Sequence, residues 1–259
     1  MATLPSQNLQ SVGALCFSSL NSPKFPSQIP SLKFPFLSPI KIKPTKLSTS
    51  NNGISNSRLV PRASASEFST DIGDILGDVS IFTASGQPVF FKDLWDQNQG
   101  IAVVALLRHF GCPCCWELAL ELKEAKARLD SAGVKLIAIG VGTPNKARML
   151  AERLPFPMDC LYADPDRKAY DVLGLYYGFG RTFFNPASTK VFSRLEALQK
   201  AVKNYTIEAT PDDRSSVLQQ GGMFVFKGKQ LLYARKDEGT GDHAALDDVF
   251  EICCKVPAA

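Results

Sequence analysis

The 259-residue chain lacks several features that would each have indicated a class of function. It has no apolar run near the roughly 20 residues of a transmembrane helix, and the apolar segment of a secretory signal is missing too. Neither a GxGxxG nor a GxxxxGK[ST] pattern follows an expected strand, so no phosphate-binding loop is expected. Only two histidines occur, and no second spaced cysteine pair is present. A structural zinc site needs four ligands, so zinc is the weaker interpretation of any Cys-x-x-Cys pair in this chain.

Acidic residues are absent from the first 66 positions. That stretch holds seven Lys or Arg and fourteen Ser, interleaved with Pro, Thr and Asn. An acid-free, basic, Ser-rich leader is typical of an organellar transit peptide, and the abundance of Pro and Ser favours the chloroplast over the mitochondrion. We therefore expect residues 1–63 to be a disordered chloroplast transit peptide, followed by a linker over 64–77, with the stroma as the destination. An ordinary disordered tail is the alternative.

Without this leader the charge of the chain changes sign. The whole chain has 29 basic and 25 acidic residues, and removal of the leader leaves 22 basic against the same 25 acidic. No basic stripe with interleaved aromatics remains, so no nucleic acid partner is expected. The seven cysteines are odd in number and irregularly spaced, unlike a disulfide scaffold. In a reducing compartment a dithiol is more often catalytic or redox-sensing than structural.

The cluster Cys112-Pro-Cys-Cys115 is the most informative motif. It lies between an apolar run over 101–107, which predicts a buried strand, and an amphipathic helix over 113–131. Unpaired N–H groups and the dipole at a helix start favour a thiolate, and reactive Cys-x-x-Cys thiols have pKa values of roughly 3.5–7.5 against about 8.5 for a free cysteine. We expect Cys112 to be the solvent-exposed nucleophile. Cys115, one turn deeper, is expected to close a disulfide with it.

Three charged or polar side chains are candidates to assist the thiol. Arg108 and His109 point to opposite faces at the end of the strand, and either one is placed to line the pocket of Cys112. The alternative for His109 is a structural role, in which its side chain caps the helix or packs in the core. Arg181 is a candidate for a cation beside the thiolate, with a solvated arginine as the alternative.

The other cysteines are expected to be structural. Cys16 and Cys114 are interpreted as packing residues, because free cysteine is among the most buried residue types. Cys160, on a short expected strand, is assigned to the core. Cys253 and Cys254 lie near the C-terminus. Minor alternatives for them are a role as a resolving cysteine from outside the Cys-x-x-Cys pair, or as a site of lipidation.

The order of expected elements predicts an α/β thioredoxin-like fold, with a central mixed sheet flanked by helices. Its right-handed crossovers bury the central strands. Residues 176–220 fit none of these elements and form an insertion. The expected elements are a hairpin with a helical turn (78–95), the strand over 101–107, the helix over 113–131, a strand (134–141), a helix (144–154), a strand (159–162), a helix (165–173), a hairpin (223–226 and 230–235) and a last helix (244–255).

Four segments resemble one known family. They are Gly86-Gln-Pro-Val89 with Phe91-Lys-Asp-Leu-Trp95, the stretch Leu106–Glu117, Tyr162-Ala-Asp-Pro-Asp-Arg167, and Gln220-Gly-Gly-Met-Phe-Val225. Their order and spacing are similar to those of the AhpC/TSA antioxidant-domain proteins of the peroxiredoxin-like 2 group, especially the chloroplast thioredoxin-like members. The resemblance covers residues 78–256 and implies a thioredoxin-like, or peroxiredoxin-like, fold.

The resemblance also implies a chemistry. It implies a thiol-dependent oxidoreductase that needs no cofactor, in which Cys112 attacks a small peroxide or lipid peroxide and Cys115 resolves. Thioredoxin or another dithiol donor would then reduce the disulfide. In the Pro-x-x-x-Thr-x-x-Cys motif of true peroxiredoxins, this chain has Ala105 for the Pro and His109 for the Thr. Members of the group with the same Cys-x-x-Cys are associated with lipid endoperoxide reduction. A non-catalytic redox sensor or interaction module of the same fold is the alternative.

Overall fold

The computed structural model describes residues 67–255, with the side chains of 254 and 255 left out. The expected transit peptide (1–63) and Cys16 lie outside the described residues, as does the side chain of Cys254. Within the described part of the chain, no helix is long and apolar enough to cross a membrane.

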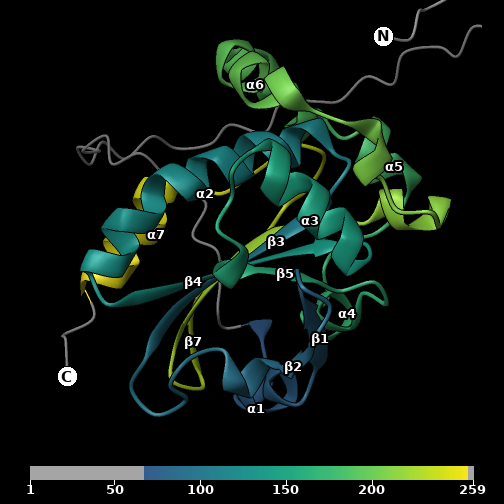
Figure 1. Ribbon diagram of the computed structural model, residues 1–259. Helices are drawn as coiled ribbons and strands as arrows, with labels where there is room; N and C mark the ends of the chain where they lie inside the picture. The colour runs from purple at the N-terminus through teal and green to yellow at the C-terminus, as the bar shows by residue number, and fades with distance from the viewer. Residues whose placement is uncertain (1–66, 256–259) are drawn as a thin grey trace, which may run out of the picture. The chain divides into compact units, whose positions relative to one another are not determined.

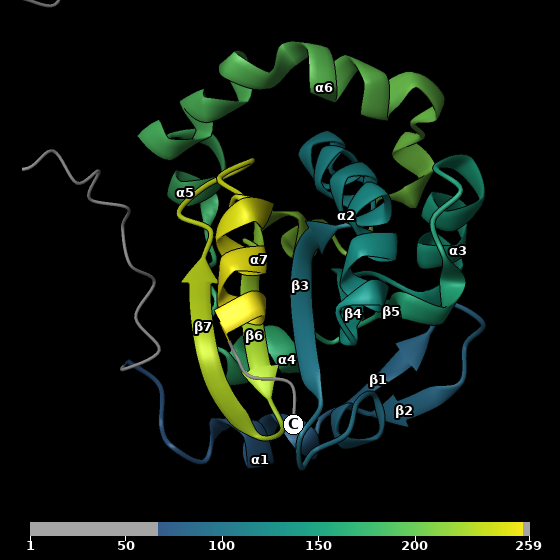
Figure 2. The ribbon, with the colours of Figure 1, turned by 90° about the vertical axis from the view of Figure 1, so that its left-hand side faces the viewer.

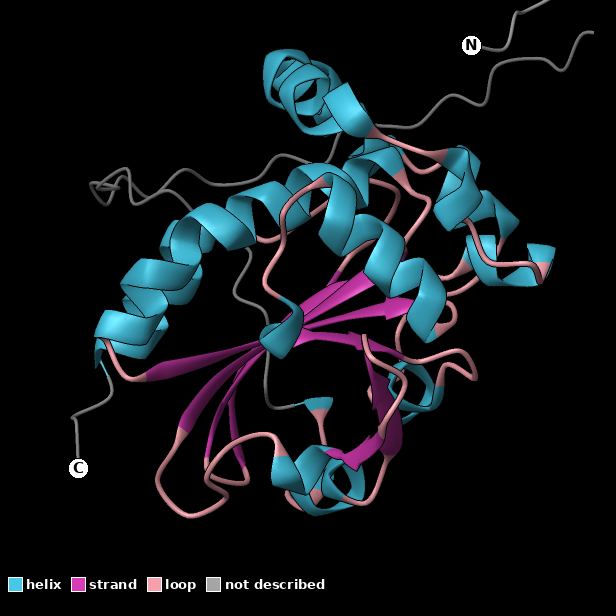
Figure 3. Ribbon diagram, in the orientation of Figure 1, coloured by secondary structure: helices cyan, strands magenta, loops and turns pink. Residues whose placement is uncertain are grey.

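A seven-stranded mixed sheet forms the centre of the fold (Figures 1 and 3). The strand order is β2-β1-β5-β4-β3-β6-β7, with β3, β4 and β5 parallel and the outer pairs antiparallel. This arrangement confirms the predicted mixed sheet. The strands are β1 (Ser80–Thr83), β2 (Pro88–Phe90), β3 (Ile101–His109), β4 (Val134–Val141), β5 (Leu161–Ala163), β6 (Gly222–Lys227) and β7 (Gln230–Lys236).

Alternation along β3 divides the core into two layers, because successive side chains of a strand point to opposite faces. Val103, Ala105 and Leu107 pack into one cluster with the long helices, and Val104 and Leu106 pack into the other with the short ones. The first face is covered by α2 (Pro113–Ser131), α3 (Pro144–Arg153) and α7 (Leu246–Lys255), and the second by α1 (Ile72–Gly77), α4 (Lys168–Val172) and the turn η2 (Phe91–Asp93) (Figure 2).

Local signals predicted the central elements well. The helix over 113–131 and the strand over 134–141 are confirmed at the predicted bounds. Gly133 lies between them with φ +68, a left-handed conformation that glycine adopts without the penalty of a side chain. The linker over 64–77 needs a correction. Its second half forms α1, which is ordered because Ile72 and Leu76 are buried against the sheet.

The insertion over 176–220 is a string of short helices rather than an irregular loop. In Figure 2 it arches over the start of α2, with α6 above that helix. Since α2 begins at the dithiol, the insertion lies over the candidate site. Its elements are α5 (Phe179–Phe183), η4 (Pro186–Arg194), α6 (Leu195–Ala201), η5 (Val202–Asn204), η6 (Ile207–Ala209) and η7 (Arg214–Leu218). One further turn, η3 (Met158–Cys160), precedes β5.

Candidate active site

The site begins where β3 ends and α2 starts. The pairing of β3 with β4 slips between Leu107 and His109, which leaves Arg108 as the extra residue of a bulge. A bulge redirects side chains at the end of a strand, and here Arg108 and His109 are both buried. Cys112 is the N-cap of α2, and Pro113 follows as the first helical residue. Proline is favoured there because it has no N–H to leave unpaired.

The guanidinium group of Arg108 is fixed beside the first thiol. Its Nε donates to the carbonyl oxygen of Gln219 at 3.0 Å, and its Nη2 donates to that of Val217 at 2.6 Å. These two bonds aim Nη1 at the Sγ of Cys112, 3.4 Å away. The backbone N–H of the same arginine donates to the Sγ of Cys115 at 3.2 Å. One residue therefore contacts both members of the Cys-x-x-Cys pair.

The pKa values of the three thiols in the cluster are shifted in different directions: that of Cys112 is lowered, and those of Cys114 and Cys115 are raised. Hydrogen bonds from the Cys114 and Cys115 thiols, together with the charges of Arg108 and His109, outweigh burial and hold the pKa of Cys112 well below its ordinary value. The pKa of Cys114 is raised, mainly by its hydrogen bond with Cys112, and that of Cys115 is raised mainly by burial. Of the three thiols, only Cys112 therefore has a lowered pKa, which favours its thiolate form. Cys114 is also buried in the core cluster, as its interpretation as a packing residue expects.

The predicted exposure of Cys112 is wrong. Its side chain is only 2% exposed, and Cys115 is fully buried. The insertion covers the dithiol: the hydroxyl of Tyr205 donates to the carbonyl oxygen of Gly111 at 2.7 Å. Thr210 packs so close to Gly111 that a Cβ there would lie 2.1 Å from its Oγ1. The residue before the nucleophile must therefore be glycine for the cover to close.

An aromatic pair holds the turn that carries Cys112. The indole Nε1 of Trp116 donates to the carbonyl oxygen of Phe110 at 2.6 Å. Its ring meets that of Tyr205 edge-on, with centroids 5.3 Å apart. Trp116, in α2, and Tyr205, in the insertion, thus donate to neighbouring carbonyl groups of the β3–α2 turn. Their contact holds this turn and the insertion together.

The buried imidazole of His109 lies in the site with a lowered pKa. Burial is the main cause that lowers the pKa of its imidazole, and the charge of Arg108 lowers it further, against the opposing charge of Cys112. Its Nδ1 is buried without a hydrogen-bond partner. Of the two residues proposed from sequence to assist Cys112, Arg108 is the one whose side chain donates to its sulfur.

A buried ion pair links the cover to α2. Glu117, whose side chain is 2% exposed, lies 3.0 Å from the Nε of Arg194 in η4. Burial raises the pKa of this carboxyl against the opposing charge of Arg194. The pair is close in distance but not aligned as a hydrogen bond, so it joins the two segments through charge.

The chain is similar to several known proteins. It is 33% identical to the thioredoxin-like protein AAED1, chloroplastic, of Arabidopsis thaliana, over 70% of this chain and 72% of that protein. It is 29% identical to the prostamide/prostaglandin F synthase of Aquarana catesbeiana, over 66% and 83% of the two chains. The model of the AhpC/TSA antioxidant enzymes matches residues 121–239.

The chain belongs to the AhpC/TSA antioxidant enzyme family. The crystal structure of peroxidoxin BcpB from Mycobacterium tuberculosis matches with a TM-score of 0.50 at 15% identity, covering 71% of this chain and 97% of that one. That similarity confirms the thioredoxin-like, peroxiredoxin-type fold. The match to the AhpC/TSA model starts six residues after Cys115, so it covers most of the domain but not the dithiol.

Several residues of this AhpC/TSA site were not found from sequence. Tyr205 and Thr210 lie about a hundred residues after the dithiol and belong to the insertion, and the carbonyl groups that orient Arg108 carry no side-chain signal. Nothing in the sequence around His243 singles it out, because no second metal-ligand pair accompanies it. Among the described residues, no group of three or more His, Cys, Asp or Glu side chains is placed to hold a metal ion.

Three other candidates lie away from the thiolate. Arg181 pairs with Glu238 and stacks on the ring of Tyr176, so it is not the cation of the site. Cys160 is buried as predicted, with its Sγ 3.4 Å from the carbonyl oxygen of Pro157. Cys253 is buried in α7, which argues against external resolution or lipidation at this residue.

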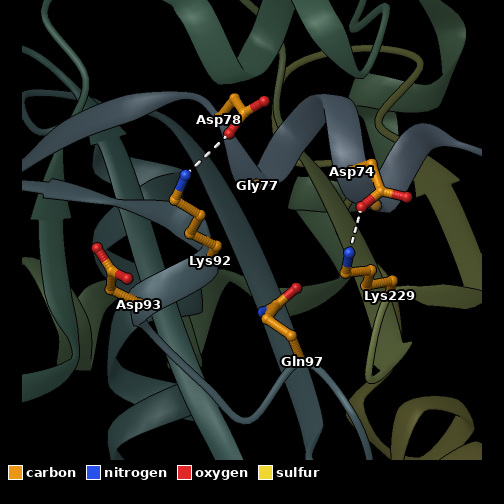
Figure 4. Close-up of a pocket in the computed structure, with 8 residues that line it drawn as sticks. Asp74, Gly77, Asp78, Lys92, Asp93, Gln97 and Lys229 are labelled. Carbon is orange, nitrogen blue, oxygen red and sulfur yellow. Dashed lines mark hydrogen bonds and ion pairs between the residues drawn. The ribbon is translucent and has the colours of Figure 1, made fainter.

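The pocket in Figure 4 is separate from the dithiol. It has a volume of about 440 Å³, and its mostly polar lining comes from α1 and the residue after it, from η2 and the loop after it, and from the β6–β7 turn. Its two lysines are neutralised, Lys92 by Asp78 and Lys229 by Asp74. It lies near the start of β3, because Lys227 pairs with Ile101, whereas the cysteines follow the end of that strand. We therefore assign no part of the thiol chemistry to it.

Proposed function

We propose that this AhpC/TSA protein is a thiol-dependent oxidoreductase in which Cys112 is the nucleophile and Cys115 the resolving thiol. The observation that carries the proposal is the position of Arg108. Two backbone carbonyl groups accept from Nε and Nη2 of its guanidinium, and the third nitrogen, Nη1, lies 3.4 Å from the Sγ of Cys112. A fixed cation at that distance favours the thiolate, which is the reactive form of cysteine.

The proposed reaction runs in three balanced steps. The Cys112 thiolate attacks the terminal oxygen of a hydroperoxide, the O–O bond breaks, and the inner oxygen leaves as an alkoxide that takes up a proton. The products are a sulfenic acid and an alcohol. The Cys115 thiol then displaces water from the sulfenic acid, and the Cys112–Cys115 disulfide forms. A dithiol donor reduces this disulfide by exchange and is itself oxidised.

Small hydroperoxides and lipid peroxides are the proposed substrates, and thioredoxin is the proposed donor. Similarity to a prostamide/prostaglandin F synthase supports small oxygenated lipids as a class. The apolar residues around the dithiol are consistent with such substrates, since Cys112 and Cys115 belong to the same hydrophobic cluster as Trp116 and Phe110.

Import into the chloroplast stroma is the proposed localisation. The acid-free, Ser-rich composition of residues 1–66 supports it, as does the chloroplastic designation of the Arabidopsis relative. A fluorescent fusion that carries residues 1–70 should enter plastids. If the fusion stays in the cytosol, the proposed import is wrong.

Turnover assays on the purified residues 64–259 test the proposed function. Consumption of hydrogen peroxide, an organic hydroperoxide and an oxidised protein is measured, each with thioredoxin and its reductase. Cys112→Ser should abolish turnover, and Cys115→Ser should stop it after one attack and leave a sulfenic acid or a mixed disulfide on Cys112. Cys160→Ser is the matched control, because that thiol is buried elsewhere, and it should retain activity. Turnover that survives Cys112→Ser would refute the assignment.

The burial of Cys112 supports a second candidate. A thiol that is 2% exposed must be uncovered before a substrate reaches it. A non-catalytic redox sensor, whose dithiol reports oxidation through a change in the insertion, also fits that geometry. Mild oxidation that joins Cys112 to Cys115 without multiple turnovers on any of the three substrates would favour the sensor.

A further inference from the structure

A buried carboxylate and imidazole lie directly behind the first turn of α2. The Oδ2 of Asp237 is 3.0 Å from the Nδ1 of His243, and the Nε2 of the same ring is 3.1 Å from the carbonyl oxygen of Cys114. The side chains of Asp237 and His243 are 2% and 4% exposed. The ring thus bridges a buried acid and the turn that carries the dithiol.

The partners of the ring fix the number of protons on the pair. A carbonyl oxygen only accepts hydrogen bonds, so the Nε2 that faces Cys114 must carry a hydrogen. A carboxylate oxygen and a bare imidazole nitrogen cannot bond at 3.0 Å without a proton between them. One proton is therefore shared by Asp237 and His243, in addition to the one on Nε2.

We propose that Asp237 and His243 form a proton-sharing pair whose imidazolium is a second buried cation, beside Arg108, that keeps Cys112 in its thiolate form. This role rests on the proposed function, in which Cys112 is the nucleophile. The pair acts on the sulfur through the first turn of α2, so Asp237 and His243 are positioning residues rather than catalytic ones.

The charges around the pair favour a shared proton that lies on the His243 ring. Asp242 is occupied by other cations, accepting from Arg235 at 2.8 Å and Lys190 at 2.6 Å. Arg235 approaches Asp237 at 3.5 Å on the oxygen that faces away from the ring. The ring is therefore the group left to neutralise the inner oxygen of Asp237.

The α2 side of the ring carries groups of both signs. Arg194 opposes a positive ring, whereas the thiolate of Cys112 favours one. The charge of the ring in turn lowers the pKa of Glu117, although burial keeps that pKa raised overall. Burial alone would lower the pKa of His243, but the hydrogen bond and charge of Asp237 and the charge of Cys112 outweigh it, so this pKa is raised.

Asp237→Asn tests the proposal by the sign of its effect. The amide keeps both hydrogen bonds of the ring, with its own N–H donating to Nδ1, but leaves a neutral imidazole. The pH midpoint for alkylation of Cys112 by iodoacetamide, followed by peptide mass spectrometry, should then rise by roughly half to one unit. If Asp237 were instead an anion beside a neutral ring, the substitution would remove a negative charge and the midpoint would fall. A fall, or no shift, would overturn the proposal.

Two further measurements keep the test independent of folding and of turnover. Asp242→Asn removes a carboxylate of the same network that does not contact the ring, and it should not raise the midpoint. In the unsubstituted protein, ¹⁵N NMR at about pH 8 should show two ring N–H groups on His243. His109→Gln leaves this ring as the only histidine and assigns its signals. A single ring N–H on His243 at that pH would refute the shared proton, whether or not the protein turns over peroxides.

Discussion

Removal of the Arg108 guanidinium is the sharpest test of how Cys112 becomes a thiolate. At 3.4 Å and an effective dielectric constant of about 20, a unit charge would stabilise the thiolate by about 5 kcal/mol. This figure is an upper bound, because the charge is spread over the guanidinium and the Cys114 and Cys115 thiols hold part of the pKa shift. Opposite charges at such distances change a pKa by about 1–3 units. We expect Arg108→Met to raise the pKa of Cys112 by about one unit, at the low end of that range.

The assay is the pH profile of Cys112 alkylation in reduced protein. Arg108→Lys is the matched variant: it keeps a cation but cannot bond two carbonyl groups and a sulfur at once, so its midpoint should lie between those of the wild type and the Met variant. Arg108→Met leaves the carbonyl groups of Val217 and Gln219 without this donor, and Arg108→Lys leaves at least one of the three acceptors without it. Each unpaired carbonyl group should cost about 1–3 kcal/mol of unfolding free energy. Circular dichroism and urea unfolding establish that each variant is folded. An unchanged midpoint in folded Arg108→Met would refute the argument that this cation acidifies Cys112.

Two further predictions concern packing and pH. Gly111→Ala should lower the unfolding free energy by about 1–3 kcal/mol and speed alkylation of Cys112, because the added Cβ would lie 2.1 Å from the Oγ1 of Thr210. Gly180→Ala is the control, because a Cβ there would have no atom within 4 Å. Equal urea midpoints for the two variants would contradict the close approach of Thr210 to Gly111. Burial raises the pKa of Cys160 to about 12 from the ordinary 9.0. The unfolded thiol therefore ionises first, and stability should fall as the pH rises from about 9 towards 12. Cys160→Ala should flatten this decline in urea unfolding, and an unchanged slope would contradict it.

The parts of the fold that the sequence predicted are those with local causes. The run over 101–107 has no polar residue to interrupt it, and helical spacing over 113–131 ends at Gly133, which takes the left-handed conformation that closes a helix. The predicted helix begins at residue 113, and so the position of Cys112 directly before its first turn followed from the sequence. Spacing also placed Arg108 and His109 next to the thiol, although not the carbonyl groups that orient the arginine.

Contacts between segments that are distant in the sequence could not be predicted from local patterns. The segment over 176–220 forms six short helical pieces without a sustained apolar period, so nothing in its pattern shows which face it covers. Residues 72–77 are similar: α1 is six residues long and is ordered by burial of Ile72 and Leu76, not by helix propensity. Asp237 and His243 meet only because β7 and the loop before α7 pass behind the first turn of α2.

The mistaken exposure of Cys112 has a physical lesson. An open helix start needs only its N–H groups to favour a thiolate, whereas a buried thiolate also loses its hydration and must be compensated by fixed donors and charges. Here the carbonyl groups of Val217 and Gln219 that orient Arg108 belong to the same insertion whose Tyr205 closes over Gly111. The insertion that buries the sulfur of Cys112 therefore also orients Arg108, the cation that favours its thiolate form. Displacement of Tyr205 alone would leave the carbonyl groups of Val217 and Gln219 on Arg108, whereas opening of the insertion as a whole would remove them.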